Sequence, residues 1–107
     1  MKKGDIILIP FPFTDLSGQK NRPAVVVFAS ETDIMLAFIT SQLKWQEGHD
    51  LKLEPSVENG LKKVSLVRLS KIASLDKDLA LGKLGNLSSE EIKLLDQNLI
   101  NILGIDC

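Results

Sequence analysis

The 107-residue chain has one cysteine, one histidine, no tyrosine and one tryptophan. The cysteine is the last residue, Cys107, so the chain has no internal disulfide, and we expect it to work in a reducing compartment, the cytoplasm. One histidine and one terminal cysteine cannot build the usual shell of a zinc site. No apolar run approaches the roughly 20 residues that span a bilayer. The sequence therefore excludes a disulfide scaffold, a zinc domain and a membrane-spanning helix.

The N-terminal residues argue against a secretory signal. Lys3 is followed at once by Gly4 and Asp5, and Pro10 and Pro12 interrupt the apolar run that comes next. The sequence also lacks the DxDxDG pattern of a calcium loop and the GxxxxGK[ST] pattern of a phosphate loop. With 44% hydrophobic residues, the chain is expected to fold as one domain over residues 1–107.

The formal net charge of −1 argues at first sight against a nucleic-acid binder. The charges are unevenly distributed, however. Residues 88–107 hold four acids and one base, so the first 87 residues carry a net charge of +2. A modest basic surface in that part is therefore compatible with an acidic total.

Short apolar runs bounded by turn signals indicate strands. Two prolines at alternate positions predict that residues 10–21 form a loop, because proline cannot donate to a strand ladder. Loops of that length are often functional. The expected strands are Asp5–Ile9, Ala24–Ala29, Ile34–Thr40, Leu51–Leu53, Val64–Ser70 and a short segment at 82–85.

The C-terminal segment has the clearest local signal, that of a helix. Ser88 and Glu91 fit a capping box, and Gly104 is placed to end the helix. An apolar stripe at helical spacing must be buried against the strands; it consists of Ile92, Leu95, Leu99, Ile102 and Leu103. The predicted fold is mainly β (α+β), a small, strongly bent antiparallel barrel with a C-terminal helix.

Three segments could carry chemistry. Arg22 opens a buried strand just after the long loop, where its guanidinium could bind a phosphate or pair with a surface acid. Thr40 ends another strand; its hydroxyl could project into a site or be a strand-end polar group without a role. Arg68, in an apolar strand, either pairs across the sheet or lines the same cleft. Aromatic faces at Phe13 and Trp45 could stack on bases or belong to the core, and His49 is interpreted as a surface residue.

These segments together resemble the MazF/PemK family of toxins from bacterial type II toxin–antitoxin systems. The resemblance covers nearly the whole chain. Its most specific features are GDII with the following Pro10-Phe11, the NRPAVVV strand that contains Arg22, and the AFITSQ segment that contains Thr40. The segment VSLVRLSKI, which contains Arg68, and the C-terminal helix follow in the same order.

The resemblance implies a barrel related to SH3 folds, a homodimer and an endoribonuclease that needs no metal or other cofactor. It implies cleavage of single-stranded RNA by attack of the ribose 2′-hydroxyl on the adjacent phosphate, which leaves a cyclic phosphate and a 5′-hydroxyl. It also implies an acidic antitoxin that occupies the RNA groove, and operator DNA as a possible target of the toxin and antitoxin together.

Carried over by position, the resemblance assigns catalysis to Arg22 and Thr40. Substrate contacts are expected from Ser17, Gln19, Lys20, Ser41, Gln42, Arg68 and Ser70, and the segment from Phe11 to Asn21 corresponds to the one that borders the RNA groove. The chain departs from some members at two positions where they have a carboxylate, here Ser17 and Ser70, and Asp15 is a candidate substitute for the first.

Two alternatives to an endoribonuclease remain. One is a non-nucleolytic member that poisons DNA gyrase, as the related CcdB toxins do, and the other is a DNA-binding co-repressor that works with its antitoxin. The second is disfavoured by the net charge of −1 and by the lack of a helix-turn-helix pattern.

Overall fold

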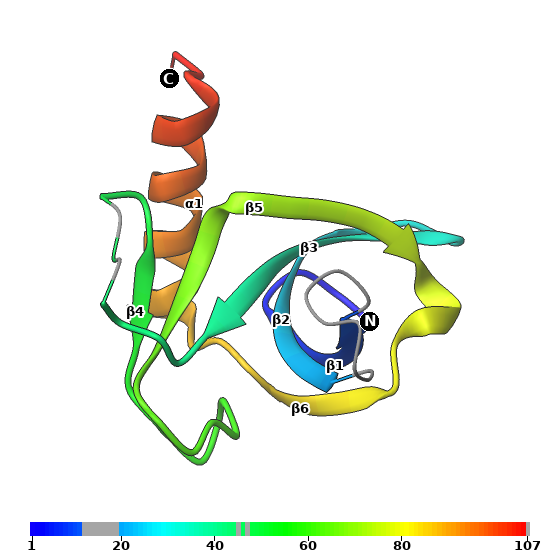
Figure 1. Cartoon of the computed structure of the whole chain (residues 1–107). Helices are drawn as coiled ribbons and strands as arrows, with labels where there is room; N and C mark the ends of the chain where they lie inside the picture. The colour runs from blue at the N-terminus through cyan, green and yellow to red at the C-terminus, as the bar shows by residue number, and fades with distance from the viewer. Residues whose placement is uncertain (12–19, 45, 47, 107) are drawn as a thin grey trace.

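The computed structural model describes residues 1–11, 20–44, 46 and 48–106. Within this part of the chain, six strands form one antiparallel sheet that curls strongly, and a single α-helix, α1, packs beside it (Figure 1). The elements are β1 (Asp5–Phe11), β2 (Lys20–Ala29), β3 (Asp33–Thr40), β4 (Leu51–Leu53), β5 (Ser65–Asp76), a 3₁₀ turn η1 (Lys77–Leu79), β6 (Gly82–Asn86) and α1 (Ser89–Leu103). This confirms the predicted fold, including the short strand at residues 82–86.

The sheet has the order β4-β5-β3-β2-β1-β6. Its strongest irregularity lies between β3 and β5, where Phe38 pairs with Arg68 but its neighbour Ala37 pairs with Ile72. Between these two pairs β3 advances by one residue and β5 by four. Such a bulge bends the strand that contains the extra residues. Figure 1 shows β5 turning sharply along its length, so that it borders both β4 and the far end of β3.

Strand β1 extends beyond the end that the sequence predicts. Pro10 pairs with Asn21 and Phe11 with Lys20, where the prolines predict a loop. The prediction is wrong at these positions because β6 pairs with β1 only from Asp5 to Leu8. Past Leu8, β1 has a strand on one side alone, so the missing N–H of Pro10 costs no ladder bond. The rest of the predicted loop, residues 12–19, lies outside the described residues.

The two faces of the sheet carry separate apolar cores, because successive side chains of a strand point to opposite faces. The first core lies under α1 and includes Ile6, Val25, Ile39, Val67 and the helical Leu95. The second core lies on the opposite face, away from α1, and is lined by Ile7, Ile9, Ala24, Val26, Ile34 and Leu36. The candidate site residues extend from this second face.

Helix α1 begins and ends where local signals predict. The Ser88 hydroxyl accepts from the Glu91 backbone N–H at 3.2 Å, and the Glu91 carboxylate accepts from the Ser88 N–H at 2.8 Å. Gly104 ends the helix in the left-handed conformation, with φ of +68°. Lys3 forms an ion pair with Asp96 and thereby ties the N-terminal segment to the helix.

Within the described residues, no helix has the length and apolar character needed to cross a membrane.

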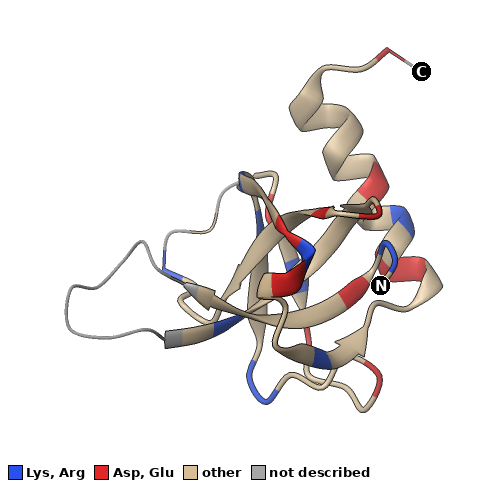
Figure 2. Cartoon of the chain, turned by 90° about the vertical axis from the view of Figure 1, so that its right-hand side faces the viewer, with Lys and Arg blue, Asp and Glu red and all other residues tan. Residues whose placement is uncertain are grey.

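The apolar stripe of α1 is only partly buried. Leu95 and Leu99 are buried, but Leu103 is 63% exposed, contrary to the prediction that the whole stripe packs on the strands. The reason is length, since the C-terminal turns of the helix project beyond the edge of the sheet in both views (Figures 1 and 2). Figure 2 also shows acidic residues on the N-terminal half of α1, where Glu90 and Glu91 lie in the first turn.

Candidate functional site

Arg22 and Thr40 come from adjacent strands and stand at the same level of the sheet. The pairing of β2 with β3 sets Ala24 opposite Phe38, and Arg22 and Thr40 each lie two residues beyond this last paired position. Residues two apart in a strand point to the same face, so Arg22 shares the face of Ala24, and Thr40 that of Phe38. The two residues that the resemblance marks as catalytic are therefore neighbours on the face away from α1.

The Thr40 side chain has a local hydrogen bond that orients it. Its Oγ1 accepts from the backbone N–H of Gln42 at 3.1 Å, in a turn that closes directly after β3. The hydroxyl is the acceptor in this bond, so its own hydrogen is the atom that it can donate to an incoming oxygen. The Gln42 side chain in turn accepts from the backbone N–H of Lys44 at 3.4 Å, which orders the start of the following segment.

Arg68 of β5 lies on the same face of the sheet as Thr40, at the next position of that face. It is opposite Phe38 on β3, two residues from the Thr40 level, so it is a diagonal neighbour of Thr40 at about 7–8 Å. Its Nε lies 3.7 Å from Oδ2 of Asp50, and the two side chains are 13% and 1% exposed. Of the two interpretations of Arg68, an ion pair across the sheet is therefore the one that the structure contains, and Arg68 also shares a face with Arg22 and Thr40.

The remaining predicted site residues fall into three groups. Ser41 and Gln42 are exposed directly after Thr40, and Ser70 is exposed in the irregular part of β5 between Arg68 and Ile72. Lys20 begins β2, which places its backbone beside the same end of the sheet. Ser17 and Gln19, as well as Asp15, Phe13 and Trp45, lie outside the described residues. His49 is exposed, which confirms its interpretation as a surface residue.

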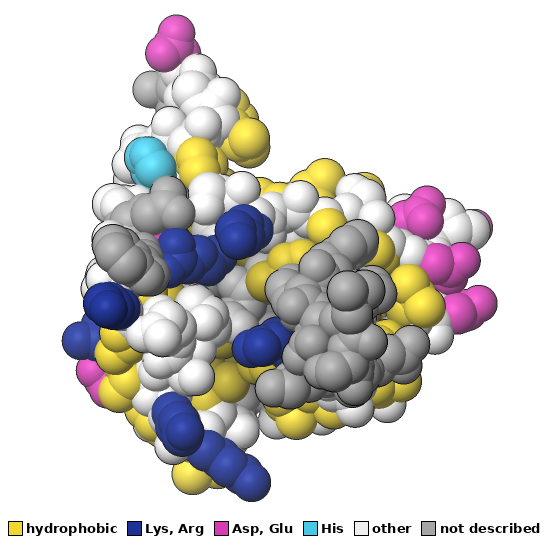
Figure 3. Space-filling model, in the orientation of Figure 1, with side chains coloured by type: hydrophobic (Ala, Val, Ile, Leu, Met, Phe, Trp, Pro, Cys, Tyr) yellow, Lys and Arg dark blue, Asp and Glu magenta, His cyan; other side chains and the backbone are white. Residues whose placement is uncertain are grey.

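Charge is segregated across the face drawn in Figure 3. Lys and Arg side chains lie at the left, at the bottom and near the centre of this face, whereas most Asp and Glu side chains lie at the right-hand edge and at the tip of the helix, with some acidic surface also at the left edge. Acids are close together in the chain around the β2–β3 turn, at Glu31 and Asp33, and at the end of β5 and in η1, at Asp76 and Asp78. This face therefore carries a modest basic surface, in line with the charge distribution along the sequence.

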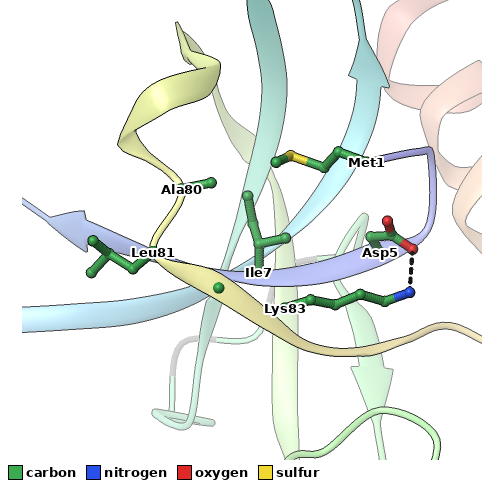
Figure 4. A pocket seen from close by; sticks show the side chains of 7 residues that line it. Met1, Asp5, Ile7, Ala80, Leu81 and Lys83 are labelled. Atoms are coloured by element: carbon green, nitrogen blue, oxygen red, sulfur yellow. Dashed lines mark ion pairs between the residues drawn. The ribbon is translucent and has the colours of Figure 1, made fainter.

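The described residues contain no cluster of three or more His, Cys, Asp or Glu side chains that could hold a metal ion. A separate hollow of about 310 Å³ lies at the start of β1 and β6. Its lining includes Met1, Ile7 and Leu81, and the ion pair of Asp5 with Lys83, 3.3 Å long, borders it (Figure 4). It contains none of the predicted site residues.

Asp50 is the residue at this site that the sequence did not single out. It precedes the strand Leu51–Leu53, and extending the β4–β5 register by one residue sets it opposite Arg68. In the sequence it is one acid at the end of a polar stretch, with no motif around it. Only the register of the two strands identifies it as the partner of Arg68.

Comparisons with known proteins agree with this fold. The sequence profile of a family described as PemK-like, MazF-like toxin of type II toxin–antitoxin system matches residues 2–103. The match covers nearly the whole chain and defines the class, a toxin of a type II toxin–antitoxin system. The chain belongs to the PemK/MazF toxin family. A sequence search of curated proteins gave no significant match.

Solved structures of the same fold come from mycobacteria and Deinococcus. The Mycobacterium tuberculosis toxin MazF-mt6 is 17% identical, with a TM-score of 0.78 over 96% of this chain and 99% of that one. A mycobacterial endoribonuclease in complex with its cognate antitoxin is 16% identical, with a TM-score of 0.76 over 100% and 98%. MazE-MazF (form II) from Deinococcus radiodurans is 18% identical, with a TM-score of 0.77 over 99% and 97%. At these identities the likeness shows a shared fold.

Proposed function

We propose that this toxin is a metal-independent, sequence-specific endoribonuclease that cleaves single-stranded RNA, including mRNA, and so inhibits growth. The observation that carries the proposal is that Arg22 and Thr40 lie at the same end of β2 and β3 on one face of the sheet, with Arg68 a diagonal neighbour of Thr40. Two cations and an oriented hydroxyl on one face suit a phosphodiester, whose transition state gathers negative charge on the phosphoryl oxygens. One of the similar solved structures is titled an endoribonuclease.

In the proposed reaction the ribose 2′-oxygen attacks phosphorus and the bond to the 5′-oxygen breaks, which gives a 2′,3′-cyclic phosphate and a 5′-hydroxyl. Solvent water takes up the 2′-hydroxyl proton and supplies the proton that the leaving 5′-oxygen gains. Arg22 stabilises the charge of the pentacoordinate phosphorane, because an arginine stays protonated and is a poor base at neutral pH. Thr40 donates its hydroxyl hydrogen to a phosphoryl oxygen. These roles need donors with fixed orientation, and the bond from the Gln42 N–H to Thr40 helps to supply that orientation.

The base that removes the 2′-hydroxyl proton is not one of the buried carboxylates of the described residues. Asp50 is paired with Arg68 and its side chain is 1% exposed, so a ribose cannot reach it. Ser70 is exposed but is a hydroxyl where some members of the family have a carboxylate. We propose that the site works chiefly by stabilising charge, with substrate contacts from Ser41, Gln42, Arg68 and Ser70 and from Ser17, Gln19 and Lys20 in the preceding segment.

A defined single-stranded RNA, incubated with purified protein in excess EDTA, tests this proposal. We expect cuts at a short sequence motif with cyclic phosphate and 5′-hydroxyl ends, and a loss of at least about 100-fold in cleavage rate for Arg22→Ala. Lys93→Ala, which removes an exposed cation on α1, serves as the control and should cleave like the wild type. The proposal fails if a wide panel of RNAs stays intact; damaged DNA with intact transcripts would instead indicate a gyrase poison.

The proposed partner is a cognate acidic antitoxin that covers the basic surface around Arg22 and Arg68. Antitoxin complexes occur among the similar solved structures, one with a mycobacterial endoribonuclease. An acidic segment would match the Lys and Arg side chains of this face and so compete with RNA for them (Figure 3). We expect that coexpression with the small acidic protein encoded next to the toxin restores growth, and that persistent toxicity would contradict the assignment.

We further propose that the toxin works as a homodimer in the cytoplasm, where its mRNA substrate is found. The support for a dimer is the part of α1 that extends past the sheet, with Leu103 and Ile105 exposed by 63% and 52%. Exposed apolar side chains on a projecting helix are suited to a protein contact.

A further inference from the structure

We propose that Asp50 is a positioning residue that holds Arg68 in the orientation in which it contacts RNA. The inference rests on the proposed function, and it adds a carboxylate to a site in which two expected carboxylate positions are serines. Asp50 acts through Arg68 and does not touch the substrate.

The strand register brings the two residues together. Leu51 pairs with Val67 and Lys52 with Leu66, so the next position of the ladder sets Asp50 beside Arg68. On its other side Arg68 is opposite Phe38 of β3. The arginine therefore has Phe38 opposite it through backbone pairing on one side, and on the other the carboxylate of Asp50, which directly precedes the paired Leu51.

Burial makes this ion pair stronger than a surface pair. The Asp50 side chain is 1% exposed and the Arg68 side chain 13%, with 3.7 Å between Oδ2 and Nε. Ion pairs on the surface contribute little because water and salt screen them, whereas removing one partner of a buried pair leaves an uncompensated charge. The carboxylate therefore favours conformers in which the guanidinium stays over it.

The ion pair with Asp50 also affects how the terminal Nη groups of Arg68 can bind RNA. The contact with Asp50 is made at Nε, and the terminal Nη groups are the ones that fork onto a phosphate or stack beside a base. An arginine that is already ordered loses less conformational entropy when it binds, so the same contact contributes more to the transition state. The pair also links Asp50, which directly precedes β4, to β5 across 17 intervening residues.

The matched pair of variants is Asp50→Asn and Asp5→Asn. Asp5 is also buried, at 4% exposure, and its Oδ1 pairs with Lys83 at 3.3 Å at the other end of the sheet. Both substitutions remove one buried carboxylate charge and keep the side-chain shape. They differ in the cation that loses its partner: Arg68, which belongs to the proposed RNA surface, in Asp50→Asn, and Lys83, which does not, in Asp5→Asn.

Two readouts are needed. The first is the ¹⁵Nε–¹Hε signal of Arg68 in the NMR spectrum, assigned with Arg68→Gln; we expect an ordered side chain in the wild type and in Asp5→Asn, and an averaged one in Asp50→Asn. The second is single-turnover RNA cleavage below the melting temperature of each variant. We expect a loss of about 10-fold or more in Asp50→Asn, none in Asp5→Asn, and no further loss when Asp50→Asn is added to Arg68→Gln.

The readouts separate this inference from the proposed function. If the Arg68 signal is as ordered in Asp50→Asn as in the wild type, Asp50 does not position Arg68, whatever the cleavage rates. If Asp50→Asn cleaves like the wild type, or lowers the rate equally with and without Arg68, the positioning role is also overturned. If the wild type cleaves no RNA, the proposed function has failed, and the NMR signal alone then decides whether Asp50 orders Arg68.

Discussion

Gly85 of β6 lies directly against the backbone of Asn59. A Cβ atom on Gly85 would come within 2.2 Å of the Glu58 carbonyl oxygen and 2.5 Å of the Asn59 carbonyl carbon. Asn59 is itself fully buried, and its side chain bonds the backbone of three residues of the turn, Glu54, Ser56 and Leu61. The backbone N–H of Asn86 completes the contact by donating to Glu58 at 2.8 Å. The turn that precedes β5 therefore packs against the edge strand β6 and holds it in place.

Gly85→Ala is expected to destabilise the fold by about 2–3 kcal/mol, because the new methyl group meets backbone that cannot rotate away. The free energy of unfolding from urea titration measures this effect. Gly82→Ala is the control in the same strand, since a Cβ there meets nothing within 4 Å. Equal stability of the two variants would show that the backbone of Glu58 and Asn59 moves to make room for the methyl group at little cost in free energy.

Thr40→Val is expected to lower the RNA cleavage rate by about 10- to 100-fold, because it keeps the shape of the side chain and removes the donor to the phosphate. Thr40→Ser keeps the hydroxyl and should retain most of the activity. Single-turnover cleavage of a defined RNA separates the two variants, with thermal unfolding as a check that both are folded. Cleavage by Thr40→Val at the wild-type rate would remove the hydroxyl from the mechanism.

Ser88→Ala should destabilise the protein by about 1 kcal/mol, because it leaves the Glu91 backbone N–H without its cap. In a domain of this size that is a fall of about 4–8 °C in Tm. Ser89→Ala, at the exposed neighbouring position, is the control and should change Tm little. A Tm equally low in both variants would contradict this role of the Ser88 cap, because alanine is a better helix former than serine and Ser89→Ala should not destabilise the helix.

Leu103→Glu is expected to convert the proposed dimer into monomers, because a charge would replace an apolar side chain on the projecting part of α1. Light scattering coupled to size exclusion measures the mass. Asn101→Glu adds the same side chain at another exposed position of the helix and should leave the dimer intact. A wild type that is monomeric, or a Leu103→Glu protein that keeps the dimer mass, would contradict this role of the helix.

Much of the architecture could be predicted because its signals are local. The capping box and Gly104 defined both ends of α1, and alternation predicted Leu51–Leu53 as a half-exposed strand. The prediction at Pro10 failed because proline is excluded only where a strand has neighbours on both sides, and the sequence does not say where β6 stops pairing. The prediction that Leu103 is buried failed for a similar reason. Helical spacing identifies the apolar stripe of the helix, but it does not tell how far the sheet extends to cover that stripe.

At the site, the sequence by itself determined which residue types are available: Arg22, Thr40 and Arg68 in strands, two serines at the positions where some family members have carboxylates, and only one His and one Cys. Tertiary structure decided what each of them meets. Asp50 and Arg68 are far apart along the chain and become neighbours only because β4 adds to β5 in one register. Register depends on which faces are buried and on where β5 bends, and both are properties of the assembled sheet.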